Sequence, residues 1–369
     1  MSEFSLIRCA SALFAGGARI VDVPRVTDEV MSAWAAGRVN LIGDHTDYTG
    51  GLAAPMTIQF GTTVTVRHGG TDVRLRSDRY AGECRVPIDV RNPAATEPAW
   101  ARYVAGVVAE LHPPTGATGH ITSDLPIGAG LSSSASLEVA VALALGADDD
   151  PGELAQMCQR AEQRASGVPC GILDQLAITH GRAGHLLRLD CTTREAIPVP
   201  LPSGVEVFAV HSGEARALDS SQYALRRAQC AAAERLIGPL RTADVARVQA
   251  IDDPLIRSRA RHVVTENLRV DAFVAALRGE DIDCAGRLMV DSHASLRDDF
   301  EVSTPVVDRL VEAMLTLPGV RGARMTGGGF GGVVVAICDP GTTVPVGKSW
   351  RLRAVNGTVA PRTGGTRRR

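Results

Sequence analysis

The chain has 369 residues, which is long enough for two domains that share an interface or for one unusually large domain. Hydrophobic residues account for 45% of it and charged residues for 22%, and the formal net charge is −2 at pH 7. This near-neutral balance argues against a nucleic acid or an anionic membrane as the main partner.

The cysteines and the apolar segments predict a soluble, cytoplasmic protein. The eight cysteines are scattered without a Cys-x-x-Cys pair, which is typical of reduced thiols and not of a disulfide framework or a zinc site. We recognise no secretion signal at the N-terminus. The longest apolar stretch, Leu137 to Leu145, is far shorter than the roughly 20 residues that span a bilayer.

Hydrophobic periodicity predicts both helices and strands along the chain. A helix is expected over Phe4 to Phe14, and a half-buried strand over Met56 to Arg67, where the residues alternate with period two. The apolar stretch Leu131 to Leu145 predicts a buried helix, and the serines of its first turn are suited to capping its amides. The remaining expected elements are helix Glu153 to Ser166, strands His185 to Asp190 and Val205 to Val210, and helices Ser220 to Leu236, Leu255 to Leu277 and Pro305 to Leu315.

Two further segments indicate boundaries. The proline-rich run Ile197 to Pro202 is the predicted domain boundary, because repeated proline opposes both a helix and a central strand. The glycine- and arginine-rich residues Thr363 to Arg369 are expected to be frayed.

The first of three glycine-rich segments runs from Gly37 to Gly51 and carries three strongly polar side chains, Asp44, His45 and Asp47. Carboxylates accept hydrogen bonds from vicinal hydroxyls, and histidine donates or accepts, so the segment suits a polyhydroxylated ligand. A polar turn that only bonds itself is an equally good interpretation of the composition.

The second segment, Pro126 to Ser136, leads small residues and three serines into the buried helix. Such a segment directs free amides and the positive helix end towards an anion, and a serine hydroxyl can ligate a magnesium ion bound to phosphates. The alternative is a tightly packed helix start without a ligand.

The third segment, Gly327 to Gly332, matches the pattern G-x-G-x-x-G, but a dinucleotide site needs a helix after the glycines. A β-branched run, Val333 to Ile337, follows instead, so we reject a nicotinamide site. Gly347-Lys348-Ser349 is not a phosphate-binding Walker motif either, because Thr342 stands where that motif needs glycine.

Together these segments resemble the GHMP small-molecule kinases, and specifically the galactokinases. Residues Gly37 to Tyr48 are similar to the first family signature apart from Asp44, and the second segment is similar to the family phosphate loop. Met325 to Gly332 resembles the C-terminal glycine loop, and Pro169 to Gln175 the catalytic segment. The resemblance covers roughly Gly37 to Ile337 in the family's order.

The resemblance implies an α+β architecture with two domains. Residues 1–199 would form an N-terminal domain with the fold of ribosomal S5 domain 2. Residues 200–369 would form a ferredoxin-like C-terminal domain that carries the glycine loop 326–332. Sugar and nucleotide would meet between the two domains.

The resemblance also implies roles for individual residues, with ATP and Mg²⁺ as cofactors. Asp174 would accept or orient the proton of the sugar hydroxyl, and Arg38 would lie beside it and stabilise the charge of the transferring phosphoryl group. Ser134 and Glu162 would bind the magnesium ion. The phosphates would meet Gly128, Gly130, Ser132, Ser133 and Ser134, and Trp100 would lie near the adenine, although it is equally suited to a core. The sugar hydroxyls would meet Asp44, His45, Asp47, Gly171 and Tyr223.

Four departures from the family pattern concern mainly the sugar side. Asp44 replaces a glutamate expected near C6 of the sugar, and Ala36 replaces a proline. His211 to Leu218 differs from the usual stretch before the sugar-binding tyrosine. The family normally has a helix before its final strand, and this chain lacks that helix after Ile337. The final strand is expected here at Trp350 to Val355.

We therefore expect a monomeric, ATP-dependent 1-kinase for galactose or a close galacto-configured sugar. An alternative is a 1-kinase for a galacto-sugar altered at C6, such as an octose of lincosamide-type assembly, or for N-acetylgalactosamine or galacturonate. A further alternative is a sensor that binds galactose and ATP without catalysis.

Overall fold

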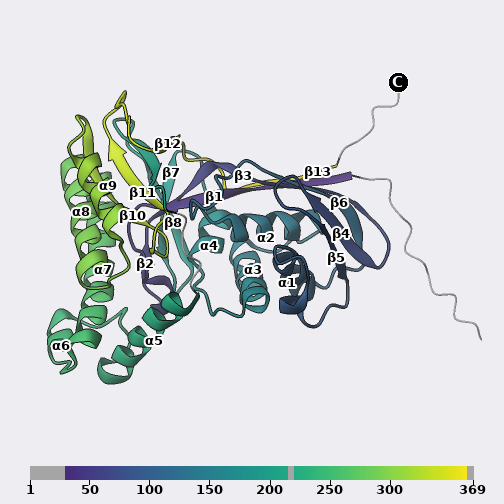
Figure 1. The fold of residues 1–369 in the computed structure, drawn as a ribbon, viewed down its shortest axis with the longest axis horizontal. Coiled ribbons are helices and arrows are strands. Elements are labelled where there is room, and N and C mark those ends of the chain that lie inside the picture. Colours follow the sequence, from purple (N-terminus) through teal and green to yellow (C-terminus); the bar gives the residue numbers. More distant parts are fainter. Residues whose placement is uncertain (1–29, 215–219, 364–369) are drawn as a thin grey trace, which may run out of the picture.

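The computed structural model describes residues 30–214 and 220–363, and these form three sheets flanked by helices (Figure 1). The expected helix at Phe4 to Phe14 lies outside the described residues, as do residues 364–369. Among the described residues, no helix has the length and apolar character needed to cross a bilayer.

A six-stranded sheet in the order β13-β1-β3-β6-β4-β5 forms one half of the molecule. Its neighbouring strands are antiparallel, except for the parallel pair β4 and β6. The strands are β1 (Val30–Asn40), β3 (Pro55–His68), β4 (Asp72–Ser77), β5 (Glu83–Pro87), β6 (Ala117–Ser123) and β13 (Thr358–Thr363).

Four helices lie together on one face of this sheet, as Figure 1 shows. They are α1 (Ala101–Leu111), α2 (Ser133–Ala144), α3 (Pro151–Ser166) and α4 (Leu173–His180), and the short 3-10 turn η2 (Pro93–Ala95) packs against α1 and α3. A second 3-10 turn, η1 (Asp47–Thr49), follows β1 in the chain. The alternating apolar residues of β3 and the apolar α2 meet in a first core, which includes Val64, Val66, Val139 and Val141.

The other half contains a four-stranded antiparallel sheet in the order β10-β11-β9-β12, with helices beside it (Figure 1). Its strands are β9 (Glu206–His211), β10 (Val320–Thr326), β11 (Val333–Cys338) and β12 (Lys348–Leu352). The helices are α5 (Ser220–Ile237), α6 (Val245–Gln249), α7 (Pro254–Arg278), α8 (Ile282–Asp298) and α9 (Pro305–Leu315).

A second core joins the two halves. It combines Val39 and Met56 of the first half with Val207, Phe273 and other buried residues of the second half. A small three-stranded sheet made of β2 (Leu52–Ala53), β7 (His185–Asp190) and β8 (Glu195–Pro200) lies between them. The two halves are therefore joined by apolar packing.

Most elements predicted from periodicity are confirmed within two residues at each end. The helices expected at Glu153 to Ser166, Ser220 to Leu236, Leu255 to Leu277 and Pro305 to Leu315 are α3, α5, α7 and α9, and the expected strands are β3, β7 and β9. Residues 197–200 of the proline-rich run lie in β8, at the edge of the small sheet. Proline is tolerated in an edge strand because the strand has a partner on one side only. The predicted boundary there stays a prediction.

The C-terminal end departs from the expectation. The described residues between β11 and β12 contain no helix, as predicted, but β12 is not the final strand. The chain continues into β13, which returns to the first half and pairs with β1, where Met31 faces Thr363. A pairing with a strand more than three hundred residues away leaves no local signal in the sequence.

Helix α8 packs so closely on β10 that one position on it requires glycine. A Cβ atom added at Gly286 would lie 1.9 Å from the carbonyl oxygen of Arg321. We expect Gly286→Ala to lower the free energy of unfolding by about 1–3 kcal/mol, because the backbones must separate. Urea unfolding measures the effect. Gly279→Ala, where the nearest atom is 3.5 Å away, is the matched control, and equal losses for both variants would contradict the close-packing argument.

Candidate active site

The side chain of Asp174 lies at the first turn of α4 and is held by residues from two other elements. One of its carboxylate oxygens, Oδ1, accepts a hydrogen bond of 2.8 Å from Nε of Arg38 on β1, and Nη2 of the same guanidinium lies 2.7 Å from this oxygen in an ion pair. The other oxygen accepts a hydrogen bond of 2.6 Å from Ser132 Oγ. The Arg38 side chain is 6% exposed and that of Asp174 is 28% exposed, so the carboxylate faces solvent while the guanidinium is covered.

The backbone of β1 is arranged to present Arg38 at this point. The register between β1 and β3 shifts between Ala36 and Gly37, directly before Arg38. Gly37 lies against the phosphate-loop segment, where a Cβ atom would be 2.6 Å from Leu131 O, and Arg38 Nη1 donates to Gly130 O at 3.0 Å. Strand β1, the second glycine-rich segment and α4 therefore converge on one carboxylate.

The expected capping role of the serines before α2 is wrong for Ser132. Its backbone is left-handed, with φ of 60°, and its side chain makes no capping hydrogen bond. The hydroxyl donates to Asp174 instead. The amides at the helix start are thus left free of a side-chain cap, and Gly128 and Gly130, with φ of 73° and 70°, form the turn before them. Ser133 is exposed at the same end.

A second polar group lies behind this helix start. Ser134 Oγ donates to Glu162 Oε1 of α3 at 2.8 Å, and Gln175 Nε2 donates to Glu162 Oε2 at 2.6 Å. Burial and the nearby charge of Asp174 raise the pKa of Glu162. A hydroxyl and a carboxylate that face each other form a pair of hard oxygen ligands, which suits Mg²⁺.

Asp47 faces the segment that leads to Asp174. A Cβ atom at Gly171 would lie 1.7 Å from Asp47 Oδ2, so only glycine lets the carboxylate approach this closely. Burial, and next the charge of Asp174, raise the pKa of Asp47 to about 7. The hydroxyl of Tyr223 is hydrogen-bonded to the backbone of Gly171 at the same place.

Aromatic rings form the opposite side of this group. His45 Nδ1 lies 3.1 Å from Tyr48 Oη, and the His45 ring is 5.8 Å from that of Tyr223 and 4.8 Å from that of Phe300, centroid to centroid. The His45 backbone is left-handed, with φ of 62°. His45, Asp47, Gly171 and Tyr223, predicted from distant parts of the sequence, therefore lie together.

The Asp44 carboxylate is buried and bonded within the protein, unlike a side chain that is open to a sugar. Its Oδ2 accepts a 2.6 Å hydrogen bond from Arg324 Nη2, and its Oδ1 accepts a 2.9 Å hydrogen bond from the amide of Gly327. The residue is 5% exposed. Burial raises the pKa of Asp44, and the guanidinium of Arg324 opposes this shift. The carboxylate thus ties the first glycine-rich segment to β10 and the third.

Helix α7 holds the same segment through three side chains, His262, Glu266 and Asn267, which we call the α7 clamp. Glu266 Oε1 accepts from the amide of Gly43 at 2.9 Å, and Asn267 Oδ1 accepts from the amide of Leu52 at 2.7 Å. His262 Nε2 lies 3.1 Å from Asp44 O. Burial opposes ionisation of Glu266, but the charges of Arg269 and Arg324 hold its pKa at about 2.

Trp100 stands apart from these contacts. It precedes α1, is half-buried, packs against the first core, and donates from its indole nitrogen to Ala81 O at 3.3 Å. These contacts explain Trp100 as a residue that packs against the core. Its expected place near the adenine stays a prediction.

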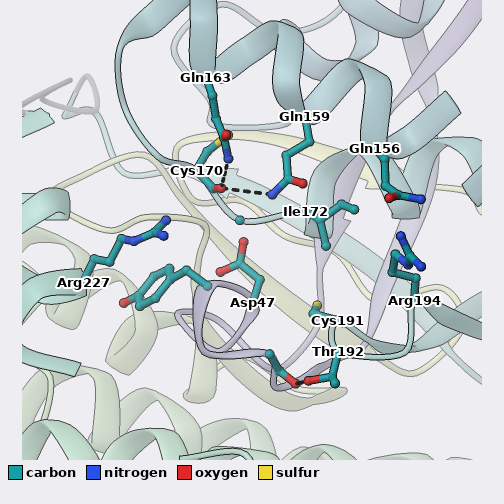
Figure 2. Close-up of a pocket in the computed structure, with 13 residues that line it drawn as sticks. Asp47, Gln156, Gln159, Gln163, Cys170, Ile172, Cys191, Thr192, Arg194 and Arg227 are labelled. Carbon is teal, nitrogen blue, oxygen red and sulfur yellow. Dashed lines mark hydrogen bonds between the residues drawn. The ribbon is translucent and has the colours of Figure 1, made fainter. Parts of the chain in front are cut away.

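A cavity of about 330 Å³ adjoins the group on the α3 side of residues 170–172 (Figure 2). Figure 2 shows the Asp47 carboxylate in the middle of the lining residues, with Arg227 and Arg194 on opposite sides. Gln159 and Gln163 donate to Cys170 O at 3.2 and 3.0 Å and hold the segment against α3. Neither Arg38 nor Asp174 lines this cavity.

Sequence reasoning missed the residues that support the site from behind. Arg324, Glu266, His262, Gln175 and Glu138 are all buried and polar. A faint signal was available for Glu138 alone, which is the one charged residue of the apolar helix α2. Which partner each one meets depends on residues that are distant in the chain.

The buried pair of Asp44 and Arg324 predicts a cost for removing the charge. Asp44→Asn leaves the guanidinium, which is 0% exposed, without its nearest carboxylate, and we expect a loss of about 3 kcal/mol in the free energy of unfolding. Urea unfolding measures this loss. Asp72→Asn, which removes an exposed ion pair with Arg85, is the control and is expected to cost much less. A similar small loss for both variants would count against the buried pair.

The pKa of His262 predicts a loss of stability in acid. Burial, and among the charges that of Arg269, lower this pKa to about 4, below the 6.5 of an unfolded histidine. Between pH 6.5 and 4 the unfolded chain therefore binds up to about one proton more, and stability falls with the pH. We expect His262→Gln to make this fall shallower in urea unfolding, and His120→Gln, at an exposed position, to leave it unchanged. An unchanged slope for His262→Gln would contradict the prediction.

Family models and curated relatives match most of the chain. Residues 26–68 match the family model of the galactokinase galactose-binding signature, residues 101–182 that of the GHMP kinases N-terminal domain, and residues 273–349 that of the GHMP kinases C-terminal domain. The galactokinase of Bos taurus is 44% identical over 324 residues, and that of Homo sapiens 43% identical over 324 residues, in each case with 83% of both chains covered.

A solved structure gives the same relationship. The crystal structure of Lactococcus lactis galactokinase with galactose superposes with a TM-score of 0.83 at 32% identity, covering 90% of this chain and 96% of that one. Methanococcus jannaschii mevalonate kinase, at 19% identity and a TM-score of 0.66, shares the fold. The chain therefore belongs to the galactokinase family of the GHMP kinases.

Proposed function

We propose that this protein is an ATP-dependent sugar 1-kinase that transfers the γ-phosphoryl group of ATP to the anomeric hydroxyl of galactose. The observation that carries the proposal is the carboxylate of Asp174, which is held by Arg38 and Ser132 and partly open to solvent. Membership of the galactokinase family, through relatives of 41–44% identity, supports galactose as the substrate.

The reaction can be followed through the residues of this site. The anomeric oxygen of the sugar forms a bond to the γ-phosphorus, and the bond from that phosphorus to the bridging oxygen of ADP breaks. Asp174 takes or orients the hydroxyl proton, and the Arg38 guanidinium stabilises the negative charge on the attacking and transferring groups. The hydrogen bonds from Arg38 and Ser132 fix the carboxylate in one orientation before the sugar binds.

Ser134 and Glu162 fit a magnesium ion by the chemistry of their donors, since Ser134 Oγ and Glu162 Oε1 face each other at 2.8 Å. Among the described residues, no group of three or more His, Cys, Asp or Glu side chains could hold a metal by itself. This agrees with a cation that takes most of its ligands from phosphates and water. When bound, Mg²⁺ would neutralise charge on the β- and γ-phosphates, and the uncapped start of α2 would meet the phosphates with its amides.

On the sugar side, the hydroxyl groups would be contacted by Asp47, Tyr223, His45 and the backbone of Gly171. Because the pKa of Asp47 is about 7 before the sugar binds, this carboxyl can change protonation near neutral pH. We further propose that the enzyme acts in the cytoplasm, where ATP is available. The described cysteines are all free thiols, which fits a reducing compartment.

A second candidate is a 1-kinase for a galacto-configured sugar altered at C6. Asp44 favours this candidate. Its position is expected near C6 of the sugar, but both oxygens of its carboxylate accept hydrogen bonds from the protein, one from Arg324 and one from Gly327. An engaged, shorter side chain leaves more room there than a glutamate that reaches towards the sugar.

A coupled ADP-release assay with Mg-ATP tests both candidates. The panel contains galactose, galacturonate, N-acetylgalactosamine, arabinose and longer galacto-configured sugars, and phosphorus NMR locates the phosphate on the product. Preference for galactose with an anomeric phosphate supports the proposal, whereas preference for a C6-altered sugar supports the second candidate. ADP release with none of the sugars, despite binding of galactose and ATP, would make the protein a sensor.

The role of Asp174 predicts a specific kinetic defect. We expect Asp174→Asn to lower kcat by about 10²- to 10⁴-fold, because the amide cannot accept the hydroxyl proton. Thermal unfolding is measured alongside, since the covered Arg38 guanidinium loses its carboxylate partner in this variant. Asp271→Asn, which removes a carboxylate from an ion pair with Arg188, is the control and should keep wild-type kcat. An Asp174→Asn variant with wild-type kcat would remove Asp174 from the chemistry.

A further inference from the structure

Two fully buried polar residues, Glu138 on α2 and Gln175 on α4, lie behind the proposed metal ligand Glu162. Both are 0% exposed. The single amide nitrogen of Gln175 contacts both carboxylates, at 2.6 Å from Glu162 Oε2 and 3.4 Å from Glu138 Oε2. Glu138 thus reaches the metal side only through Gln175.

Glu138 is poorly explained as a packing residue. Its second oxygen, Oε1, has no hydrogen-bond partner, and neither does Gln175 Oε1. Among the described residues Glu138 forms no ion pair, and burial together with the charge of Glu162 raises its pKa well above the ordinary value. A buried carboxyl with one long hydrogen bond is unfavourable, and an apolar side chain of similar size would serve the core better.

The two carboxyl groups leave only one orientation for the amide between them. A glutamine side chain can present either its nitrogen or its oxygen, and a flip by 180° exchanges the two. Because acceptor oxygens stand at both Glu162 and Glu138, the nitrogen end is favoured and the oxygen end is repelled. With Oε2 of Glu162 held by this nitrogen, Oε1 is the oxygen that faces Ser134.

We propose that Glu138 is a positioning residue of the metal site, which fixes the Gln175 amide so that it holds Glu162 in the orientation that binds the cation. Glu138 itself does not touch the cation, the nucleotide or the sugar. The inference rests on the proposed function only in that Ser134 and Glu162 are taken as the ligands. Partners that bond directly to a metal ligand, as Gln175 does to Glu162, change metal affinity by about 10- to 100-fold when they are removed, and Glu138 acts on this partner.

Binding of Mn²⁺ to the complex of the enzyme with a non-hydrolysable ATP analogue, followed by electron paramagnetic resonance, gives a readout that does not depend on turnover. Glu138→Leu removes the acceptor, and we expect the dissociation constant of Mn²⁺ to rise about 10-fold or more. Glu138→Gln keeps an acceptor oxygen and is expected to stay near wild type. Val139→Ala, a buried neighbour on the same helix, is the matched control for loosened packing and should leave Mn²⁺ affinity unchanged.

A double-mutant cycle tests whether Glu138 acts through Gln175. We expect Gln175→Leu to weaken Mn²⁺ binding as Glu138→Leu does, and the double variant to be no weaker than Gln175→Leu alone. Thermal unfolding of each variant accompanies the titrations. For Glu138→Leu we expect little loss of stability, because it removes a buried carboxyl with an unpartnered oxygen.

Unchanged Mn²⁺ affinity in Glu138→Leu would overturn the inference, and so would a loss that persists in full in the Gln175→Leu background. A loss shared equally by Val139→Ala would assign the effect to packing and overturn it as well. Failure of the wild-type protein to bind Mn²⁺ with the ATP analogue would instead count against the proposed metal site, so the two failures are distinguishable.

Discussion

The site depends on one carboxylate that three segments of the chain hold together. Asp174 on α4 is bound by Arg38 from β1 and by Ser132 from the loop before α2, and Arg38 is also bound to the loop carbonyl of Gly130. The guanidinium of Arg38 and the hydroxyl of Ser132 are both largely buried, so neither can bond freely to water in place of its partner in the protein. Buried polar groups require partners, so these hydrogen bonds constrain the strand, the loop and the helix to meet at one point.

Two groups of buried carboxylates surround this point, and they differ in how their charge is balanced. On one side, Asp44 and Glu266 lie near the guanidinium of Arg324, at 2.6 and 3.9 Å, and form a permanent link between the halves of the molecule. On the other side, Glu162 and Glu138 lie near Asp174 and share the neutral amide of Gln175. Burial, and next the charges of the neighbouring carboxylates, raise the pKa values of Glu162 and Glu138.

The first glycine-rich segment therefore has a structural as well as a chemical task. Asp44 and the amides of Gly43 and Leu52 are bonded to β10 and to the α7 clamp, whereas His45 and Asp47, in between, face the aromatic rings and Gly171. Anchoring the ends of the segment in the core orders its middle part before a ligand arrives. Such preorganisation lowers the entropy lost on binding.

The sequence by itself determined the family, the mixed architecture, most helices and strands, and the set of candidate residues around Arg38, Asp47 and Asp174. These features are encoded locally, in glycine-rich motifs and in apolar periodicity that can be recognised without knowing the neighbours. Only the tertiary structure decided that Ser132 donates to Asp174 instead of capping α2, that Asp44 pairs with Arg324, and that β13 returns to β1. Each of these is a contact between residues far apart in the chain. The low dielectric of the interior makes such a contact strong only once both partners are buried together, and no local pattern records which partner that will be.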